Sequence, residues 1–189
     1  DLRRVIWVGR IHQVKRVEWL IEIAKLLPDI QFDVVGPKDK GNPLIDKISL
    51  EIDTLDNIHY HGKVKKDDMP SLYDRATLLC GTSIYEGFPN TYLEAWSYGI
   101  PVVTTTDPDN VIQTHDLGLA AHNIADLANA IRRLLNNREH WCECSSNAKD
   151  YYMEHHEQEL VMSQYESKLS ELLNEHTVTN NEGEISARN

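Results

Sequence analysis

The sequence predicts an α/β protein with a Rossmann-like, doubly wound parallel sheet, and three observations carry this prediction. Two short apolar runs, residues 4–9 and 32–36, each end in glycine and stand a helix length apart. Strand-like and helix-like segments alternate at least five times through residue 104, which favours parallel strands joined by right-handed crossovers. The chain has 189 residues, of which 41% are hydrophobic, and this size suits a single core.

A helix is predicted between the two glycine-ended runs, because apolar residues recur there at helical spacing. Pro28 would stop this helix before the second run begins. The apolar positions are Val17, Leu20, Ile21, Ala24 and Leu27. The first part of the chain is therefore predicted to be a βαβ unit.

The later elements follow from the same alternation of apolar runs and turn residues. In chain order we expect a helix near 44–55, a strand at 58–61, a helix near 69–75, a strand at 77–81, a helix near 91–98 and a strand at 100–104. Beyond Leu119 we expect extra C-terminal helices only, at 124–135, about 139–155 and about 158–173. Residues 175–189 are polar and poor in large apolar groups, which predicts a flexible tail.

Composition excludes several classes of function. The net charge of −11 argues against a nucleic-acid partner. No apolar run approaches the roughly 18 residues that span a bilayer, and no signal peptide is recognisable. Three cysteines are too few for a disulfide framework, which favours a reducing, cytoplasmic setting. Cys142 and Cys144 lack the second pair of ligands that a zinc site needs, so we expect no metal.

The first informative loop, residues 9–15, follows the first predicted strand and carries Arg10 and Lys15. Ligands of doubly wound folds bind outside the carboxyl ends of the strands. Arginine grips phosphate oxygens bidentately, lysine supplies a compact charge, and the next helix adds the positive end of its dipole. A diphosphate is a plausible ligand here, while ordinary solvated charge is the alternative.

The second informative segment, residues 83–95, carries Glu86 and Glu94 eight positions apart. Pro89 suits the approach to a helix, and we expect Asn90 to be its N-cap. Backbone amides between the two acids would receive an anion, and the carboxylates would accept hydrogen bonds from hydroxyl groups on either side. The alternative is that Glu94 complements the helix dipole and Glu86 is a solvated loop residue.

These two segments carry a family resemblance. Ser-x-x-Glu-Gly-Phe-Pro-Asn-x-x-Leu-Glu-Ala, starting at Ser83, and the following residues 97–103 resemble the signature of the retaining group 1 glycosyltransferases, glycosyltransferase family 4. The loop at residues 9–15 is similar to the phosphate-binding segment of that family, and the resemblance extends from about residue 4 to 135. It implies the C-terminal half of a GT-B glycosyltransferase: residues 1–174 would be the donor-binding domain, and the N-terminal acceptor domain would be absent from this chain.

The resemblance also implies roles for individual residues. Arg10 and Lys15, after Gly9, would contact the diphosphate of a nucleotide sugar, and Glu94 would contact its ribose. Glu86 would contact hydroxyl groups of the transferred sugar, and Arg10, Lys15 and Glu86 are the catalytic candidates. The remaining candidates form the sugar pocket (Gly87, Phe88, Pro89, Asn90), meet the β-phosphate through their amides (Thr91, Leu93) or lie against the nucleobase (Gly62, Lys63, Val64).

Two departures from the family pattern stand out. Family members often have Lys-Gly where this chain has Lys15-Arg16, and we expect Arg16 to cover the start of the helix with a bulky cation. The usual glycine-rich approach to an acidic loop is replaced by residues 105–110. Asp107-Pro108-Asp109 in that loop spells the Asp-x-Asp pattern of a different glycosyltransferase architecture, which we discount because so short a pattern recurs by chance.

The predicted function is retaining transfer of a hexose from a UDP-, GDP- or ADP-sugar to an acceptor, without cofactor or metal. The isolated chain would lack transfer activity, and membrane association would be peripheral and through the missing domain. A module that binds nucleotide sugars without turnover, and a GT-B-like epimerase or phosphorylase, stay open as alternatives. A nicotinamide-dependent oxidoreductase is disfavoured because no Gly-x-Gly-x-x-Gly follows the first strand. His12, His59 and His61 would lie near the same sheet edge. Of these, His61 is at a strand end near the proposed nucleotide, and a packed histidine is the preferred interpretation.

Overall fold

The computed structural model describes residues 3–38, 48, 50–52 and 54–186, with side chains described as far as Leu173. The chain divides into two compact units, Asp1–Tyr151 and Tyr152–Asn189. The predicted domain of residues 1–174 thus includes the first unit and part of the second.

The first unit is built on a six-stranded, wholly parallel sheet with the strand order β3-β2-β1-β4-β5-β6. The strands are β1 (Arg4–Val8), β2 (Gln31–Val35), β3 (Ile58–Gly62), β4 (Leu78–Gly81), β5 (Val102–Thr104) and β6 (Gly118–Ala120). This is the doubly wound order of Rossmann-like domains, so the predicted fold class is confirmed. The order reverses between β1 and β4, and ligands of such folds bind at that switch point.

The prediction that the sheet ends with the strand at 100–104 was wrong, because β6 pairs with β5. β6 has only three residues and begins with a glycine, so it gives little strand signal. The glycine is required by packing. Gly118 has φ +144°, and a Cβ atom there would lie 1.9 Å from the carbonyl oxygen of Val102.

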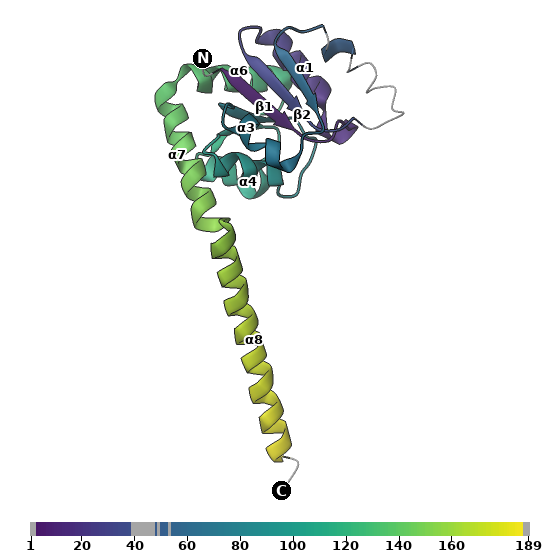
Figure 1. Ribbon diagram of the computed structural model, residues 1–189. Coiled ribbons are helices and arrows are strands. Elements are labelled where there is room, and N and C mark those ends of the chain that lie inside the picture. Colours follow the sequence, from purple (N-terminus) through teal and green to yellow (C-terminus); the bar gives the residue numbers. More distant parts are fainter. Residues whose placement is uncertain (1–2, 39–47, 49, 53, 187–189) are drawn as a thin grey trace. The chain divides into compact units, whose positions relative to one another are not determined.

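Seven helices and three short 3₁₀ turns are described (Figure 1). The helices are α1 (Val17–Leu26), α3 (Pro70–Tyr73), α4 (Asn90–Ser97), α5 (Val111–Thr114), α6 (Ile124–Asn136), α7 (Arg138–His155) and α8 (Gln158–Ser186). The turns are η1 (Gln13–Lys15), η2 (Lys66–Asp68) and η3 (Pro108–Asn110). Half of the helix predicted near 44–55 lies outside the described residues, and residues 48 and 50–52 are helical.

Successive side chains of each strand point to opposite faces of the sheet, so apolar residues pack on both faces. Val5 and Trp7 of β1 pack in one cluster with the buried residues of α1 and α6, which contact each other. α4 is drawn on the side of the sheet away from α1 (Figure 1), and its buried Trp96 is not part of that cluster. Both faces of the sheet therefore carry helices, and the loops at the carboxyl ends of the strands stay at the surface.

The second unit contains the end of α7 and the whole of α8. The backbone of α8 is helical through Ser186. The structure therefore continues the helix where the sequence predicted its end near residue 173 and a tail from residue 175. Among the helices that the structure describes, none combines the length and apolar character needed to cross a membrane.

Candidate functional site

The loops that follow β1 and β4 meet at the switch point of the sheet. The amide of Ile84 donates to the carbonyl oxygen of Val14 at 2.8 Å, which joins the two loops directly. These are the loops that carry Lys15 and Glu86. The structure thus brings together the two segments that the sequence singled out, at the sheet edge where doubly wound folds bind ligands.

Lys15 and Glu86 form an ion pair across this junction through Lys15 Nζ and Glu86 Oε1. The same carboxylate oxygen accepts a hydrogen bond from Ser83 Oγ at 2.5 Å. The Lys15 side chain is 30% exposed and that of Glu86 is 18% exposed, so the pair is partly screened from water. Glu86 is therefore not the solvated loop residue of the alternative reading.

A chain of buried hydrogen bonds fixes the backbone beside Lys15. Thr82 Oγ1 donates to the carbonyl oxygen of Lys15 at 2.6 Å and accepts from Trp7 Nε1 at 2.9 Å. Thr82 and Trp7 are almost fully buried, where an unmade hydrogen bond costs about 1–3 kcal/mol. The position of Lys15 is thus set from within the core.

Arg16 ties three loops of the site together. Its guanidinium group donates to the carbonyl oxygens of Thr82 and Ser83 at 2.6 and 2.9 Å, and to Thr105 Oγ1 at 3.1 Å. The guanidinium carbon also lies 3.7 Å from the ring centre of Trp19, a residue in the first turn of α1. Arg16 therefore covers the start of this helix, as the sequence predicted. Burial lowers the pKa of Arg16.

The backbone of Arg16 is left-handed, with φ 46° and ψ 49°. This conformation favours glycine and costs other residues about 1–2 kcal/mol. A glycine at this position in the family pattern would therefore suit the backbone. In this chain the three hydrogen bonds and the Trp19 contact offset that cost.

Helix α4 begins at Asn90, the residue that was predicted to be its N-cap. Pro89 is the N-cap residue, so the expectation for Asn90 was wrong by one position. Pro89 has no side-chain acceptor for the first amides of the helix, and Asn90 is exposed. The amides of Asn90 and Thr91 therefore lie in the first turn of a helix whose amino end faces the Glu86 loop.

Glu94 lies one turn into α4 and accepts a hydrogen bond from the hydroxyl group of Tyr73 at 2.6 Å. The Tyr73 ring stacks on that of Tyr98, with centroids 5.3 Å apart. Burial, followed by the Glu94 carboxylate, raises the pKa of the Tyr73 hydroxyl well above its ordinary value. Tyr73 is thus a fixed donor that orients Glu94, and no sequence motif pointed to this residue.

The space around these groups is open rather than enclosed. A small pocket between the ends of β1 and β4, lined by Lys15, Glu86 and Thr91 among others, has a volume of about 10 Å³, which is the size of about one water molecule. A shallow pocket of about 180 Å³ lies beside Glu94, Tyr73 and Tyr98. Both are small beside the roughly 300–1,000 Å³ typical of ligand sites. A nucleotide-sized ligand would therefore rest on the surface over these groups.

The remaining candidates line the same sheet edge. The amide of Gly9 donates to the carbonyl oxygen of Val35, and that of Gly36 to Gly62, which links the ends of β1, β2 and β3. Arg10 and Lys63 are exposed and Val64 is half-buried. Of the sugar-pocket candidates, Gly87 and Phe88 are exposed, Pro89 is buried, and Leu93 is half-buried. Their contacts with a ligand stay predictions.

The Asp-x-Asp segment has a local structural role. Asp107 accepts hydrogen bonds from the amides of Ile112 and Gln113, at 2.8 and 3.2 Å, and so caps the start of α5. Asp109 and Asn110, which connect Asp107 to α5, both adopt left-handed backbone conformations. Aspartate at this position is therefore explained by the turn into α5.

His61 contacts a buried carboxylate rather than the open sheet edge. Its Nε2 lies 2.5 Å from Oδ1 of Asp33, whose side chain is fully buried and also pairs with Arg4 and Arg75. Burial alone would raise the pKa of Asp33, but hydrogen bonds from Arg4 and His61 outweigh it and lower the pKa. His61 thus pairs with a core carboxylate, although residue 61 as a whole is exposed.

Comparisons with known proteins show which family this chain resembles. The family model for glycosyl transferases group 1 matches residues 3–137. The poly(ribitol-phosphate) alpha-N-acetylglucosaminyltransferase of Staphylococcus aureus is 27% identical over 170 residues, which cover 84% of this chain and 33% of the relative.

Solved structures agree. A Staphylococcus aureus TarM mutant in complex with Fondaparinux, alpha-GlcNAc-glycerol and UDP superimposes with a TM-score of 0.72 at 25% identity, covering 87% of this chain and 35% of that one. Sucrose-phosphate synthase from Thermosynechococcus elongatus has the same fold, with a TM-score of 0.80 at 22% identity, and the match covers 92% of this chain and 46% of that one. The chain therefore spans less than half the length of each of these three proteins.

The predicted Rossmann-like fold and the predicted group 1 family are confirmed, while the retaining mechanism and family 4 stay predictions. The family model covers most of the chain, including both loops at the switch point. The chain belongs to the group 1 glycosyl transferases, and its sheet has the Rossmann-like fold of GT-B glycosyltransferases.

Proposed function

We propose that this chain is the donor-binding domain of a retaining hexosyltransferase, and that its donor is a nucleoside diphosphate sugar. The observation that carries the proposal is the meeting of Lys15, Glu86 and the amino end of α4 at the switch point between β1 and β4. A cation, a carboxylate and free helix amides match the diphosphate and hydroxyl groups of such a donor. The UDP in the complex of the Staphylococcus aureus TarM mutant makes UDP the first nucleotide to test.

Each group would have a defined task in this proposal. Lys15 and Arg10 neutralise the charge that builds on the diphosphate as the glycosidic bond to phosphate breaks. The amides at the start of α4 bind the same phosphate, and Glu86 accepts hydrogen bonds from hydroxyl groups of the sugar. Glu94, oriented by Tyr73, binds the ribose. Because fixed cations meet the diphosphate, we propose that donor binding needs no divalent ion.

The acceptor would be bound by an N-terminal domain of the parent protein. The chain spans less than half the length of the relatives it matches, so binding without transfer is what we propose for this chain alone. Its three free cysteines, two of them buried, suit the reducing conditions of the cytoplasm.

Calorimetry with UDP, GDP and ADP tests the proposal directly. We expect at least one of them to bind wild-type protein. Binding should weaken about 10- to 150-fold in Lys15→Ala, since a charge-assisted contact is worth roughly 1.5–3 kcal/mol. Lys63→Ala serves as the comparison, since Lys63 follows β3 in the loop proposed to lie against the base. This substitution should weaken nucleotide binding less than Lys15→Ala. Failure of all three nucleotides and their glucose conjugates to bind would refute the proposal.

A further inference from the structure

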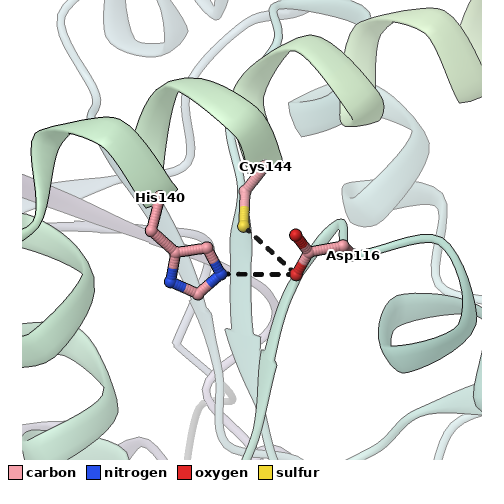
Figure 2. Close-up of side chains that lie close together, drawn as sticks. All are labelled: Asp116, His140 and Cys144. Atoms are coloured by element: carbon pink, nitrogen blue, oxygen red, sulfur yellow. Dashed lines mark hydrogen bonds and ion pairs between the residues drawn. The ribbon is translucent and has the colours of Figure 1, made fainter.

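A second cluster of chemically reactive side chains lies away from the proposed donor site. Asp116 is in the turn between α5 and β6, and His140 and Cys144 are four residues apart on α7. Residues four apart on a helix share a face, and Figure 2 shows both side chains directed toward the carboxylate of Asp116. One donor atom from each residue lies within 4.8 Å of the other two.

The three groups are an imidazole, a thiol and a carboxylate, which are the ligand types of zinc in proteins. Zinc binds nitrogen and oxygen at about 2.1 Å and sulfur at about 2.3 Å, in a tetrahedron. Such a site requires about 3.4 Å between nitrogen and oxygen ligands and about 3.6 Å between sulfur and oxygen ligands. The observed distances are 3.4 Å from His140 Nε2 to Asp116 Oδ1 and 3.6 Å from Cys144 Sγ to the same oxygen.

The surroundings hold these ligands in place. On α7, Trp141 Nε1 donates to the carbonyl oxygen of Thr77 at 2.9 Å, and Ser145 Oγ donates to that of Gly99 at 2.6 Å. These bonds anchor the helix next to His140 and next to Cys144. Cys144 is fully buried, while the Asp116 side chain is 47% exposed and gives solvent a path to the cluster.

We propose that Asp116, His140 and Cys144 bind a zinc ion, with a water molecule as the fourth ligand. The sequence led us to expect no metal, because the Cys142-x-Cys144 pair lacks a partner pair. Cys142 is exposed and is not part of the cluster. The ligands instead combine one cysteine with a histidine one turn earlier and a carboxylate from a distant turn.

This site is separate from the proposed donor site. Asp116 precedes β6, so the cluster lies toward the amino end of that strand, whereas the donor loops follow the carboxyl ends of β1 and β4. A zinc ion here would fasten α7 to the turn before the edge strand. On binding, the S–H bond of Cys144 breaks, a sulfur–zinc bond forms, and the proton passes to the buffer.

Titration of the metal-free protein with Co²⁺, followed by Zn²⁺, tests the proposal. We expect one Co²⁺ per chain, with the near-ultraviolet absorption of a cobalt–thiolate bond, displaced by Zn²⁺. Cys144→Ser should lose this absorption and His140→Gln should weaken binding at least tenfold. Cys142→Ser is the matched control, because it removes an exposed thiol from the same helix and should bind Co²⁺ like the wild type.

The melting temperature gives an independent measure. Zn²⁺ should raise it in the wild type and in Cys142→Ser, but not in His140→Gln, whose partly exposed ring can be replaced without loss of the fold. The proposal is overturned if wild-type protein shows no cobalt–thiolate absorption, or if Cys142→Ser loses it and Cys144→Ser keeps it. In the first case the three side chains form a hydrogen-bonded cluster only.

Discussion

Lys15 and Glu86 neutralise each other across the junction of the β1 and β4 loops. In the proposed function these two groups contact different parts of the donor, the diphosphate and the sugar. Donor binding must therefore exchange their mutual ion pair for two new contacts. The pair keeps both groups in position before the donor arrives, and it competes with each part of the donor separately.

This competition predicts opposite effects of Glu86 on two ligands. Glu86→Gln should bind a nucleoside diphosphate as well as the wild type or up to about tenfold more tightly, because Lys15 no longer has a carboxylate partner. It should bind the intact nucleotide sugar more weakly and should lower turnover in the full-length enzyme. Calorimetry with UDP and UDP-glucose compares the two ligands. Loss of UDP binding in this variant would show that Glu86 does not contact the sugar alone.

Glu94 should behave differently. Glu94→Ala should weaken the binding of UDP and of UDP-glucose by similar amounts, roughly 1–3 kcal/mol, because both ligands contain the ribose. Tyr73→Phe removes only the hydroxyl group that orients Glu94 and should cost about 0.5–1.5 kcal/mol for each ligand. If Glu94→Ala changes thermal stability but neither affinity, Glu94 serves the helix and not the ligand.

At position 16 we expect the glycine variant to be more stable than the alanine variant. Arg16→Ala loses three hydrogen bonds and keeps the left-handed backbone, so we expect a loss of about 2–4 kcal/mol in unfolding free energy. Arg16→Gly loses the same bonds but relieves about 1 kcal/mol of backbone strain. Urea unfolding of both variants measures the difference. Equal stability of the two would mean that the backbone at this position is not strained.

Asp33 predicts a dependence of stability on pH. Its pKa is lowered in the folded protein, so its contribution is fully present above the unfolded value of about 3.9 and is lost as the pH falls through the folded value. Asp33→Asn should therefore lower the free energy of unfolding by about 3 kcal/mol at pH 7. This is the lower end of the range for a broken buried ion pair, because Arg4 and Arg75 are partly exposed. The difference from wild type should shrink below pH 4. A constant difference across pH 3–7 would contradict this account.

Chelation separates the two proposals about metal. EDTA should leave UDP affinity unchanged, since Arg10, Lys15 and the α4 amides supply the positive charge. A loss of UDP affinity that Mg²⁺ or Mn²⁺ restores would place a divalent ion at the donor site. The control is His140→Gln, which should bind UDP like the wild type with and without EDTA.

The sequence was informative where one residue type marks a strand end or a helix start. Gly9 and Gly36 mark strand ends, Lys15 and Glu86 mark loops, and Glu94 marks the start of a helix. The fold class, and the meeting of the loops that carry Lys15 and Glu86, were therefore predictable. Contacts between distant residues were not. The hydrogen bond from Thr82 to Lys15 spans 67 positions, and no local pattern announces it. β6 was missed because its three residues form a strand only by pairing with β5.

The strand order also bears on how the site assembles as the chain folds. β1 pairs with β2 across 27 positions, from Val5 to Phe32, but pairs with β4 across 73, from Val5 to Leu78. Closing the longer loop costs about 0.9 kcal/mol more, at about 0.6 kcal/mol per doubling. We therefore expect the half-sheet that carries Lys15 to form early, and Glu86 to reach it only when β4 docks. A chain interrupted during synthesis before residue 78 would hold the loop of Lys15 without the loop of Glu86.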